Sequence, residues 1–337
     1  MNVKHKGTLV LAAVIAMAGV TRAEAGWHIA KVDQIKGTQF APLALSDSGV
    51  ATGPIGVFGI TYGASGNHTS INVFSRCATN NSTLPQGIDT AGDQAGFCLD
   101  GSGRSVGFLY LAASSSTVSI LVPGSEETRV QGTNGKFATG IYTQNSRPYG
   151  FLLNIAANTY LQLAPPQSNQ YTIVSGMSSN GSVIGTYIDT SSVTHGFIFN
   201  GSTYTAVDVP GYSYPVLNGV NASGEVVGAV YDSSSNPHAF VWQNGTAKFL
   251  NPPNEGYSVA TGITDNNQIS GYFSTTGGTV YGFRWKPAIN WVSYMNAPAG
   301  STAFAVTAIN ASGQLTGDYM QGSKQFAFIA TCKGTHC

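Results

Sequence analysis

The sequence predicts an all-β fold, a seven-bladed β-propeller of four-stranded blades, and three observations carry this prediction. Charged residues make up 9% of the 337 residues, against about 25% in an average soluble protein, which leaves few side chains for the solvated faces of helices. Glycine is abundant, with 42 copies, while hydrophobic residues reach 42%. One glycine pattern returns seven times along the chain. This composition excludes a disordered chain, collagen and a long helical bundle.

The repeated pattern is apolar-x-x-x-Gly-x-x-x-Gly, as in VNASGEVVG at 220–228 and INASGQLTG at 309–317. A looser copy, GTNGKFATG at 132–140, has one extra residue between its glycines. The second glycine of each copy, which we call the ruler glycine, recurs every 43 to 46 residues. The ruler glycines are Gly53, Gly96, Gly140, Gly185, Gly228, Gly271 and Gly317. A repeat of about 44 residues has the length of one propeller blade.

Each copy of the pattern predicts the first hairpin of a blade. A short apolar strand leads into Asn, Asp or Ser followed by glycine, and a second apolar strand leaves. The Asx or Ser side chain supports a type I turn, and the first glycine takes the left-handed position that closes the loop. The copy at 263–271 has Asn267 in place of that glycine, and asparagine tolerates positive φ better than most residues.

Two further strands complete the predicted blade. About twelve residues after most ruler glycines come an aromatic residue or His, then Gly or Ala, then Phe, for example at residues 195–197 and 238–240. A fourth apolar run usually follows and ends at proline, as in YTAVDVP at 204–210, where no ladder donor is needed.

Closure of the ring is predicted from the two ends of the chain. The last repeat supplies three strands and ends near Ala330, without a fourth. The segment Trp27 to Asp33 (WHIAKVD) resembles a fourth strand and precedes the first hairpin. We therefore predict that this N-terminal strand completes the last blade and covers its edge. An open β-solenoid is the alternative architecture.

These repeats resemble the bacterial extracellular HAF-repeat family, named after the motif seen here at His238-Ala239-Phe240. The resemblance also includes Ile309-Asn310 with Gly313 and Gly317, and it covers nearly all of the chain after residue 25. The first blade departs from it, because it has no clear H-A-F motif. The family implies an exported propeller module without a settled activity.

The N-terminus has the features of a bacterial export signal, so we predict a signal peptide at 1–25 and one propeller domain at 26–337. Lys4 and Lys6 precede the apolar stretch Leu9 to Val20, and Ala23-Glu24-Ala25 matches a cleavage site. Cleavage would remove three basic residues and one acidic residue, leaving 12 basic and 14 acidic residues, a net charge of −2. We expect a secreted protein, extracellular or periplasmic, with no membrane span and no affinity for nucleic acid.

Four cysteines remain after the predicted cleavage, and an even number in an exported protein suggests disulfides. Three pairings are open. We favour Cys77 with Cys98 and Cys332 with Cys337, because each pair is close in sequence. No C-x-x-C motif points to a metal or a catalytic thiol, and we expect neither a metal nor a cofactor.

Candidate catalytic groups are few. His195 and His238 could in principle bind zinc or transfer protons, but other repeats have Tyr or Phe at the same place, so we interpret both as packing residues. Asp100, Asp189 and Asp232 are weak candidates for a carboxylate pair. Asp at a strand end more commonly caps a turn.

The segment 54–73 of the first repeat is the best candidate for a ligand-binding loop. It is rich in Gly, Ser and Asn, it includes Tyr62 and His68, and it is longer than the same interval of other repeats. A neutral insertion, or a wrong alignment of the first repeat, is the alternative.

The sequence thus favours a binding protein that recognises a glycan or an extracellular protein at one face of the propeller. Sixteen tyrosines and a low charge suit stacking on sugars. The alternative is a polysaccharide hydrolase or lyase that uses Asp residues at the channel mouth, and 14 carboxylates, several in turns, favour binding over this.

Overall fold

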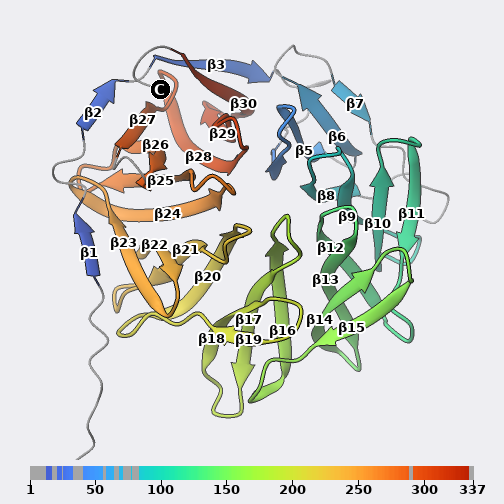
Figure 1. Ribbon diagram of the computed structural model, residues 1–337. Helices are drawn as coiled ribbons and strands as arrows, with labels where there is room; N and C mark the ends of the chain where they lie inside the picture. Colours follow the sequence, from blue (N-terminus) through green and yellow to red (C-terminus); the bar gives the residue numbers. More distant parts are fainter. Residues whose placement is uncertain are drawn as a thin grey trace, which may run out of the picture.

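The computed structural model describes residues 13–16, 21–24, 26–32, 41–55, 58–63, 68–70, 77, 83–287 and 291–333. Within them no α-helix occurs, and seven antiparallel sheets stand in a ring around a central axis, which is a seven-bladed β-propeller (Figure 1). The predicted fold class is confirmed. No helix long and apolar enough to cross a membrane is found in the described residues.

Each blade runs from an innermost first strand to an outermost fourth strand. Blades 1 to 4 contain β4 (Ala44–Leu45), β5 (Val50–Ile55), β6 (Phe58–Gly63) and β7 (His68–Ser70); β8 (Thr83–Ile88), β9 (Gln94–Leu99), β10 (Ser105–Leu111) and β11 (Ser116–Ile120); β12 (Glu127–Thr133), β13 (Phe137–Gln144), β14 (Arg147–Asn154) and β15 (Thr159–Leu163); and β16 (Ser168–Met177), β17 (Val183–Asp189), β18 (Thr194–Phe199) and β19 (Tyr204–Ala206).

Blades 5 to 7 have the same four antiparallel strands, and their order shows how the ring closes. They contain β20 (Ser213–Val220), β21 (Val226–Tyr231), β22 (Pro237–Gln243) and β23 (Thr246–Asn251); β24 (Glu255–Ile263), β25 (Ile269–Thr275), β26 (Val280–Lys286) and β27 (Trp291–Asn296); and β28 (Ser301–Ile309), β29 (Leu315–Gln321), β30 (Lys324–Lys333) and β3 (Gly26–Val32). The pairing of β3 with β30 runs from Gly26↔Lys333 to Val32↔Ala327. The N-terminal strand therefore completes the last blade, as predicted.

Two short strands precede β3. β1 (Ala13–Ala16) pairs in parallel with β23, and β2 (Thr21–Glu24) pairs in parallel with β27, so blades 5 and 6 each have a fifth strand at the rim (Figure 1). Both strands lie inside the predicted signal peptide. The structure is that of the uncleaved chain, so cleavage after Ala25 stays a prediction.

The turns between first and second strands have the predicted chemistry. The first glycine of each pattern has a positive φ, for example 78° at Gly224 and 77° at Gly313, and Asn267 substitutes with a φ of 58°. These turns, together with those between third and fourth strands, form one face of the ring, which we call the hairpin face. The turns between second and third strands and the connections between blades form the opposite face.

The ruler glycines lie where the three inner strands of a blade come closest. A Cβ added to six of them would overlap a carbonyl oxygen of the first strand; at Gly228 this is the oxygen of Val216. At Gly53 it would overlap the carbonyl oxygen of Ala41, just before β4. At Gly185 the added atom would also lie 2.9 Å from the Phe197 ring of the third strand. The repeated phenylalanine of the third strand thus packs over glycine, which has no side chain to displace it.

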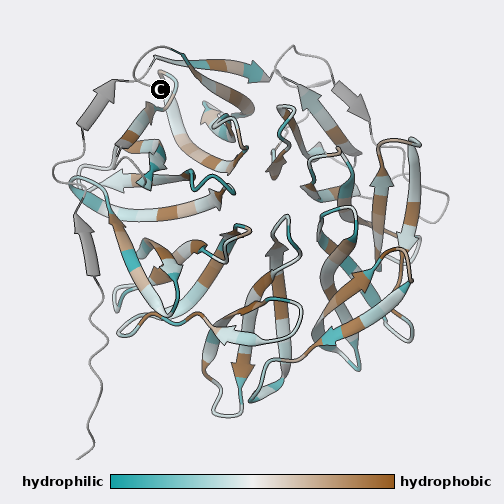
Figure 2. Cartoon of the chain, in the orientation of Figure 1, coloured by the Kyte–Doolittle hydropathy of each residue, from teal (hydrophilic) through white to brown (hydrophobic). Residues whose placement is uncertain are grey.

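The core consists of the layers between neighbouring blades, where apolar side chains of adjacent blades meet. Hydrophobic residues are distributed over the strands of the blades (Figure 2). Six third-strand phenylalanines are less than 2% exposed: Phe108, Phe151, Phe197, Phe240, Phe283 and Phe328. In blade 1 the same place is taken by Ile60, because Gly53 pairs with Ile60 as Gly228 pairs with Phe240. Blade 1 is therefore a regular blade with a divergent sequence.

Asparagine side chains join neighbouring blades along the hairpin face. Asn180 donates from Nδ2 to the Ala222 carbonyl of blade 5 (2.7 Å), and Asn266 donates to the Ala311 carbonyl of blade 7 (3.1 Å). Asn310 donates to the Ser46 carbonyl of blade 1 (2.9 Å) and so spans the seam of the ring. Asn134 donates to the Ser179 carbonyl of blade 4, and Asn221 donates to the side-chain Oδ1 of Asn267 in blade 6. The asparagines of the repeat thus link blades as well as form turns.

A disulfide joins Cys77 to Cys98 of β9, with a Cα–Cα distance of 5.8 Å, which confirms that predicted pairing. The pairing of Cys332 with Cys337 cannot be followed, because Cys337 lies outside the described residues.

Candidate functional site

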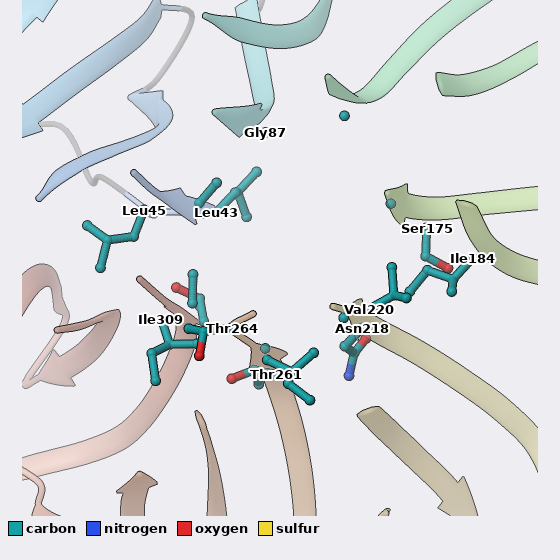
Figure 3. A pocket seen from close by; sticks show the side chains of 18 of the residues that line it. Leu43, Leu45, Gly87, Ser175, Ile184, Asn218, Val220, Thr261, Thr264 and Ile309 are labelled. Atoms are coloured by element: carbon teal, nitrogen blue, oxygen red, sulfur yellow. The ribbon is translucent and has the colours of Figure 1, made fainter. Parts of the chain in front are cut away.

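The first strands of the blades surround a cavity of about 740 Å³ on the propeller axis (Figure 3). Its wall includes Ser175 of β16, Asn218 of β20 and Thr261 of β24, and Leu43 and Leu45 of blade 1 lie across the opening from them (Figure 3). Strand alternation decides which side chains reach this wall, since residues i and i+2 of a strand share a face. In β20, for example, Tyr214, Val216 and Asn218 are exposed, whereas Pro215 and Leu217 are buried.

A β-bulge in six of the first strands places one neutral polar side chain per blade on the cavity wall. In β20 the register shifts between Leu217 and Gly219, so Asn218 is the extra residue. The same shift occurs in β8, β12, β16, β24 and β28. The side chains concerned, which we call the polar ring, are Gln86, Gln131, Ser175, Asn218, Thr261 and Thr307. These groups donate and accept hydrogen bonds without bringing a charge to the wall.

Tyrosines gather on the side of the ring opposite the hairpin face. Tyr171, Tyr214 and Tyr257 lie near the start of the first strands of blades 4, 5 and 6, and each precedes its ruler glycine by 14 residues. Tyr214 is 67% exposed and Tyr171 is 40% exposed. We call this side of the ring the tyrosine face. These three tyrosines hold one repeat position on adjacent blades, and we call them the tyrosine rim. Val216 and Val259, two residues after Tyr214 and Tyr257, line the cavity.

Two further tyrosines line the cavity behind this rim. Tyr231 of β21 and Tyr272 of β25 belong to its wall, and the rings of Tyr257 and Tyr272 meet edge to face with centroids 6.4 Å apart. Burial raises the pKa of Tyr272, and the neighbouring Tyr257, Tyr231 and Asp318 raise it further. The Tyr272 hydroxyl is therefore neutral at physiological pH and available as a hydrogen-bond donor.

The backbone of Tyr214 is strained, with a φ of +48°. A bulky residue rarely adopts this left-handed conformation, which costs on the order of 1–3 kcal/mol. The strain occurs beside a register shift between Ser213 and Val216, at the most exposed aromatic side chain among the described residues. Backbone strain of this kind is concentrated at functional sites, so it adds to the case for the tyrosine rim.

The predicted catalytic carboxylates occupy equivalent turns on the tyrosine face, each in its own blade. Asp189 Oδ1 accepts hydrogen bonds from the amides of Ser191 and Val193, both at 2.8 Å, and Asp100 and Asp232 bond to their own turns in the same way. Backbone hydrogen bonds are the largest cause that holds the pKa of Asp100 and Asp189 below the usual value and lowers that of Asp232 to about 2. No hydrogen bond joins any two of the three carboxylates, all of which are described. Their catalytic role stays a prediction, and their geometry is that of turn-capping groups.

His195 lies between two carboxylates of its own blade. Its Nδ1 is 2.9 Å from Asp208 Oδ2, and its Nε2 is 3.4 Å from Asp189 Oδ2. Burial opposes the charged imidazole, but the hydrogen bonds and charges of these two residues outweigh it and raise the pKa of His195. The ring also stacks on Tyr187, with centroids 5.2 Å apart.

His238 makes the corresponding contacts in blade 5 and reaches the next blade. Its Nε2 is 3.2 Å from Asp232 Oδ2, and its Nδ1 is 3.3 Å from Glu255 Oε1 of blade 6. Ser258 donates to the same Glu255 oxygen, and burial raises the pKa of that carboxyl. Both nitrogens of each histidine thus have protein partners, which fits the packing role predicted from the repeat. The described residues contain no cluster of three or more His, Cys, Asp or Glu that could hold a metal ion.

The predicted ligand-binding segment 54–73 is not a long loop, because it contains part of β5 and all of β6 and β7. Tyr62 is 6% exposed and packs in the core with Leu45 and Ile60, a place that fits packing rather than ligand contact. His68 begins β7, and its side chain lies outside the described residues. In the sequence the interval appears long because the third strand of blade 1, β6, has Ile60 in place of the phenylalanine that marks third strands elsewhere.

The polar ring and the tyrosine rim were not predicted from the sequence, although a signal for them exists. With the ruler glycines aligned, Tyr171, Tyr214 and Tyr257 fall at one position, and Ser175, Asn218 and Thr261 fall ten residues before the glycine. Because these positions lie in the weakly patterned first strand, only its bulge and its place at the axis reveal their importance.

Comparison with known proteins supports the fold and goes no further. No family model and no curated protein matches the chain. Among solved structures, an acylaminoacyl peptidase of Pyrococcus horikoshii has a TM-score of 0.59 at 8% identity, over 88% of this chain and 52% of that one. A prolyl endopeptidase has a TM-score of 0.60 at 10% identity, over 90% and 51%. The chain therefore spans about half the length of these peptidases. The β-propeller domain of the Trilobed protease from Pyrococcus furiosus has a TM-score of 0.53 at 10% identity, over 86% and 96%.

Proposed function

We propose that this protein is an exported, non-enzymatic propeller that binds a neutral glycan at the tyrosine face. The observation that carries the proposal is the tyrosine rim of Tyr171, Tyr214 and Tyr257, at one repeat position of three adjacent blades, with Tyr231 and Tyr272 lining the axial cavity nearby. Tyrosine offers an apolar ring and a polar tip, which match the apolar face and the hydroxyl edge of a sugar. Rings on three adjacent blades would contact successive sugars of a chain.

The polar ring supports a neutral ligand, and the two carboxylates of the cavity wall, Asp47 and Asp265, accept hydrogen bonds from backbone amides at the hairpin face. The polar ring offers amide and hydroxyl groups that hydrogen-bond to sugar hydroxyls, and ligand sites typically combine apolar contacts with a few convergent polar groups. The mature chain would have a net charge of only −2, so no strong field favours a charged polymer. Export and membership of the HAF-repeat family belong to the same proposal; the N-terminal sequence and the repeat motifs support them.

The test is a glycan array on the full chain, followed by titration of the best ligand against two variants. We expect Tyr214→Ala to raise the Kd about tenfold, since an aromatic contact contributes on the order of 1.4 kcal/mol. Leu161→Ala on β15 is the matched control, because Leu161 is 48% exposed but lies on the outermost strand of blade 3. An array without any bound glycan, or equal losses in both variants, would contradict the proposal. Capture of a protein instead would move the function to protein recognition.

A further inference from the structure

A second cavity, of about 290 Å³, lies between blades 5 and 6 at the hairpin face, away from the tyrosine rim. Its apolar wall includes Val241 of β22 and Ile269 and Trp285 of blade 6. The small-molecule sites of proteins usually measure about 300–1,000 Å³, so this cavity suits a ligand of roughly amino-acid size. It shares only Ile263 of its lining with the axial cavity, so it forms a separate site from the tyrosine face.

The cavity is lined by two residues of opposite charge and by a tryptophan with a buried donor. Glu225 and Lys248 both line it, and neither forms an ion pair with any described residue. The Glu225 carboxylate receives one hydrogen bond, from Asn221 Nδ2 to Oε2 (2.8 Å). Trp285 is 2% exposed, and its Nε1 has no hydrogen-bond partner among the described residues. A buried donor left in this state costs about 1–3 kcal/mol, which a ligand acceptor would recover.

At the junction of blades 6 and 7, a side chain of the protein fills the space that is a cavity between blades 5 and 6. Arg284 of blade 6 occupies the position of Val241 in blade 5, since both directly follow the repeated phenylalanine. Arg284 is 3% exposed, and its Nη1 donates to the Gly313 carbonyl of blade 7 (2.9 Å). Blade 6 has the neutral Gln268 where blade 5 has Glu225. Compared with that junction, the junction of blades 5 and 6 has Val241 in place of the arginine and Glu225 in place of the glutamine. It therefore lacks the internal cation and has an additional carboxylate.

We propose that this cavity binds an α-amino acid with an apolar side chain. The ligand ammonium takes the place that a guanidinium holds at the next junction and pairs with Glu225. The ligand carboxylate accepts hydrogen bonds from Lys248 and Trp285 Nε1, and the apolar side chain packs on Val241 and Ile269. A neutral sugar would leave both charges unpaired, and a simple carboxylic acid would meet the repulsion of Glu225.

The experiment is calorimetric titration of the full chain with L-leucine, with 4-methylpentanoate (no ammonium), with 3-methylbutylamine (no carboxylate) and with glucose. We expect leucine to bind and the other three to bind at least about tenfold more weakly, because each lacks a charge-assisted contact. No binding of leucine at 10 mM (about −2.7 kcal/mol), or equal binding of glucose or of either single-charge analogue, overturns the proposal.

Three variants test whether leucine binds in this cavity. Val241→Arg copies the residue of blade 6 and should abolish binding by filling the space, and Glu225→Gln should weaken leucine about tenfold without weakening 4-methylpentanoate. Trp285→Phe removes the donor and keeps a ring, and it should weaken leucine and the acid alike. Trp242→Phe is the matched control, since Trp242 is the same repeat position in blade 5 and does not line the cavity. Unchanged leucine affinity in Val241→Arg with a folded ring, measured by circular dichroism, would refute this location.

Discussion

The ruler glycines should be among the least replaceable residues of the protein, and Gly228→Ala tests this. The added Cβ would overlap the Val216 carbonyl oxygen and lie 3.2 Å from Leu217 Cα. Both neighbours belong to the backbone of β20, so no side chain can turn away. Relief requires β20 and β21 to move apart, although Leu217 is only 1% exposed.

The loss of stability expected for Gly228→Ala can be estimated from two contributions. Overpacking a well-packed core costs about 1–3 kcal/mol, and each ladder hydrogen bond that the separation weakens adds about 1 kcal/mol. With two such bonds the free energy of unfolding falls by about 3–5 kcal/mol, out of roughly 5–15 kcal/mol for a natural protein. For about 310 folded residues, with an unfolding entropy of about 2.1 cal/mol/K per residue, the Tm falls by about 5–8 °C.

The assay is thermal denaturation followed by circular dichroism, with Gly176→Ala as the matched control. Gly176 lies in the bulge of β16, where no atom comes within 4 Å of an added Cβ and φ is not positive. We expect that control to change the free energy of unfolding by less than about 1 kcal/mol, because alanine also restricts the unfolded chain. Equal Tm values for Gly228→Ala and the wild type would refute the steric reasoning.

Three further outcomes are expected. Replacing Cys77 and Cys98 by serine should lower the free energy of unfolding by about 3 kcal/mol, because the bridge closes a loop over a separation of 21 residues. Chemical denaturation measures this loss, and an unchanged midpoint would argue against the bridge. Asn310→Ala removes a buried hydrogen bond across the seam of the ring and should lower the free energy of unfolding by about 1–3 kcal/mol in the same assay. A loss below about 0.5 kcal/mol (about a twofold change in the equilibrium constant) would show that the bond is dispensable. Because Asp208 and its neighbours raise the pKa of His195, its charged form stabilises the fold below about pH 6.5, and this contribution disappears as the pH rises through the raised pKa. The stability difference between wild type and His195→Gln should therefore shrink from about pH 5.5 to about pH 8, and NMR titration should place the pKa of His195 above that of a model peptide; a difference that grows with pH would contradict this.

The ring could be predicted from the sequence because its signals are local. Most blades have the same three signals: a glycine at positive φ, an Asx turn, and a phenylalanine two residues past His or Tyr. These signals depend on contacts within one blade, so seven copies of the repeat predict seven blades. Closure could be predicted because the last repeat lacked a strand that the N-terminus supplied. Blade 1 was misjudged because Ile60 replaces the phenylalanine that identifies the third strand elsewhere.

The candidate sites could not be predicted because they depend on neighbours distant in sequence. Asn218 looks like any polar residue in a strand until a bulge turns it toward the axis. Glu225 and Trp285 are 60 residues apart in sequence, and only the packing of blade 5 against blade 6 brings them to one cavity. The inter-blade bonds of the asparagines were hidden for the same reason, since turn chemistry already explained those residues.

The pairing of β3 with β30 also sets the order of events during synthesis. Gly26 meets Lys333, so the first strand of the domain has no partner until almost the whole chain is made. Six blades contain their own four strands and can form in succession, whereas the seventh must wait for the last residues. A partly synthesised chain is thus held open at the seam, and the ring is completed only once β30 has been made. A pairing at such long range also makes this last step slow compared with the folding of a single hairpin.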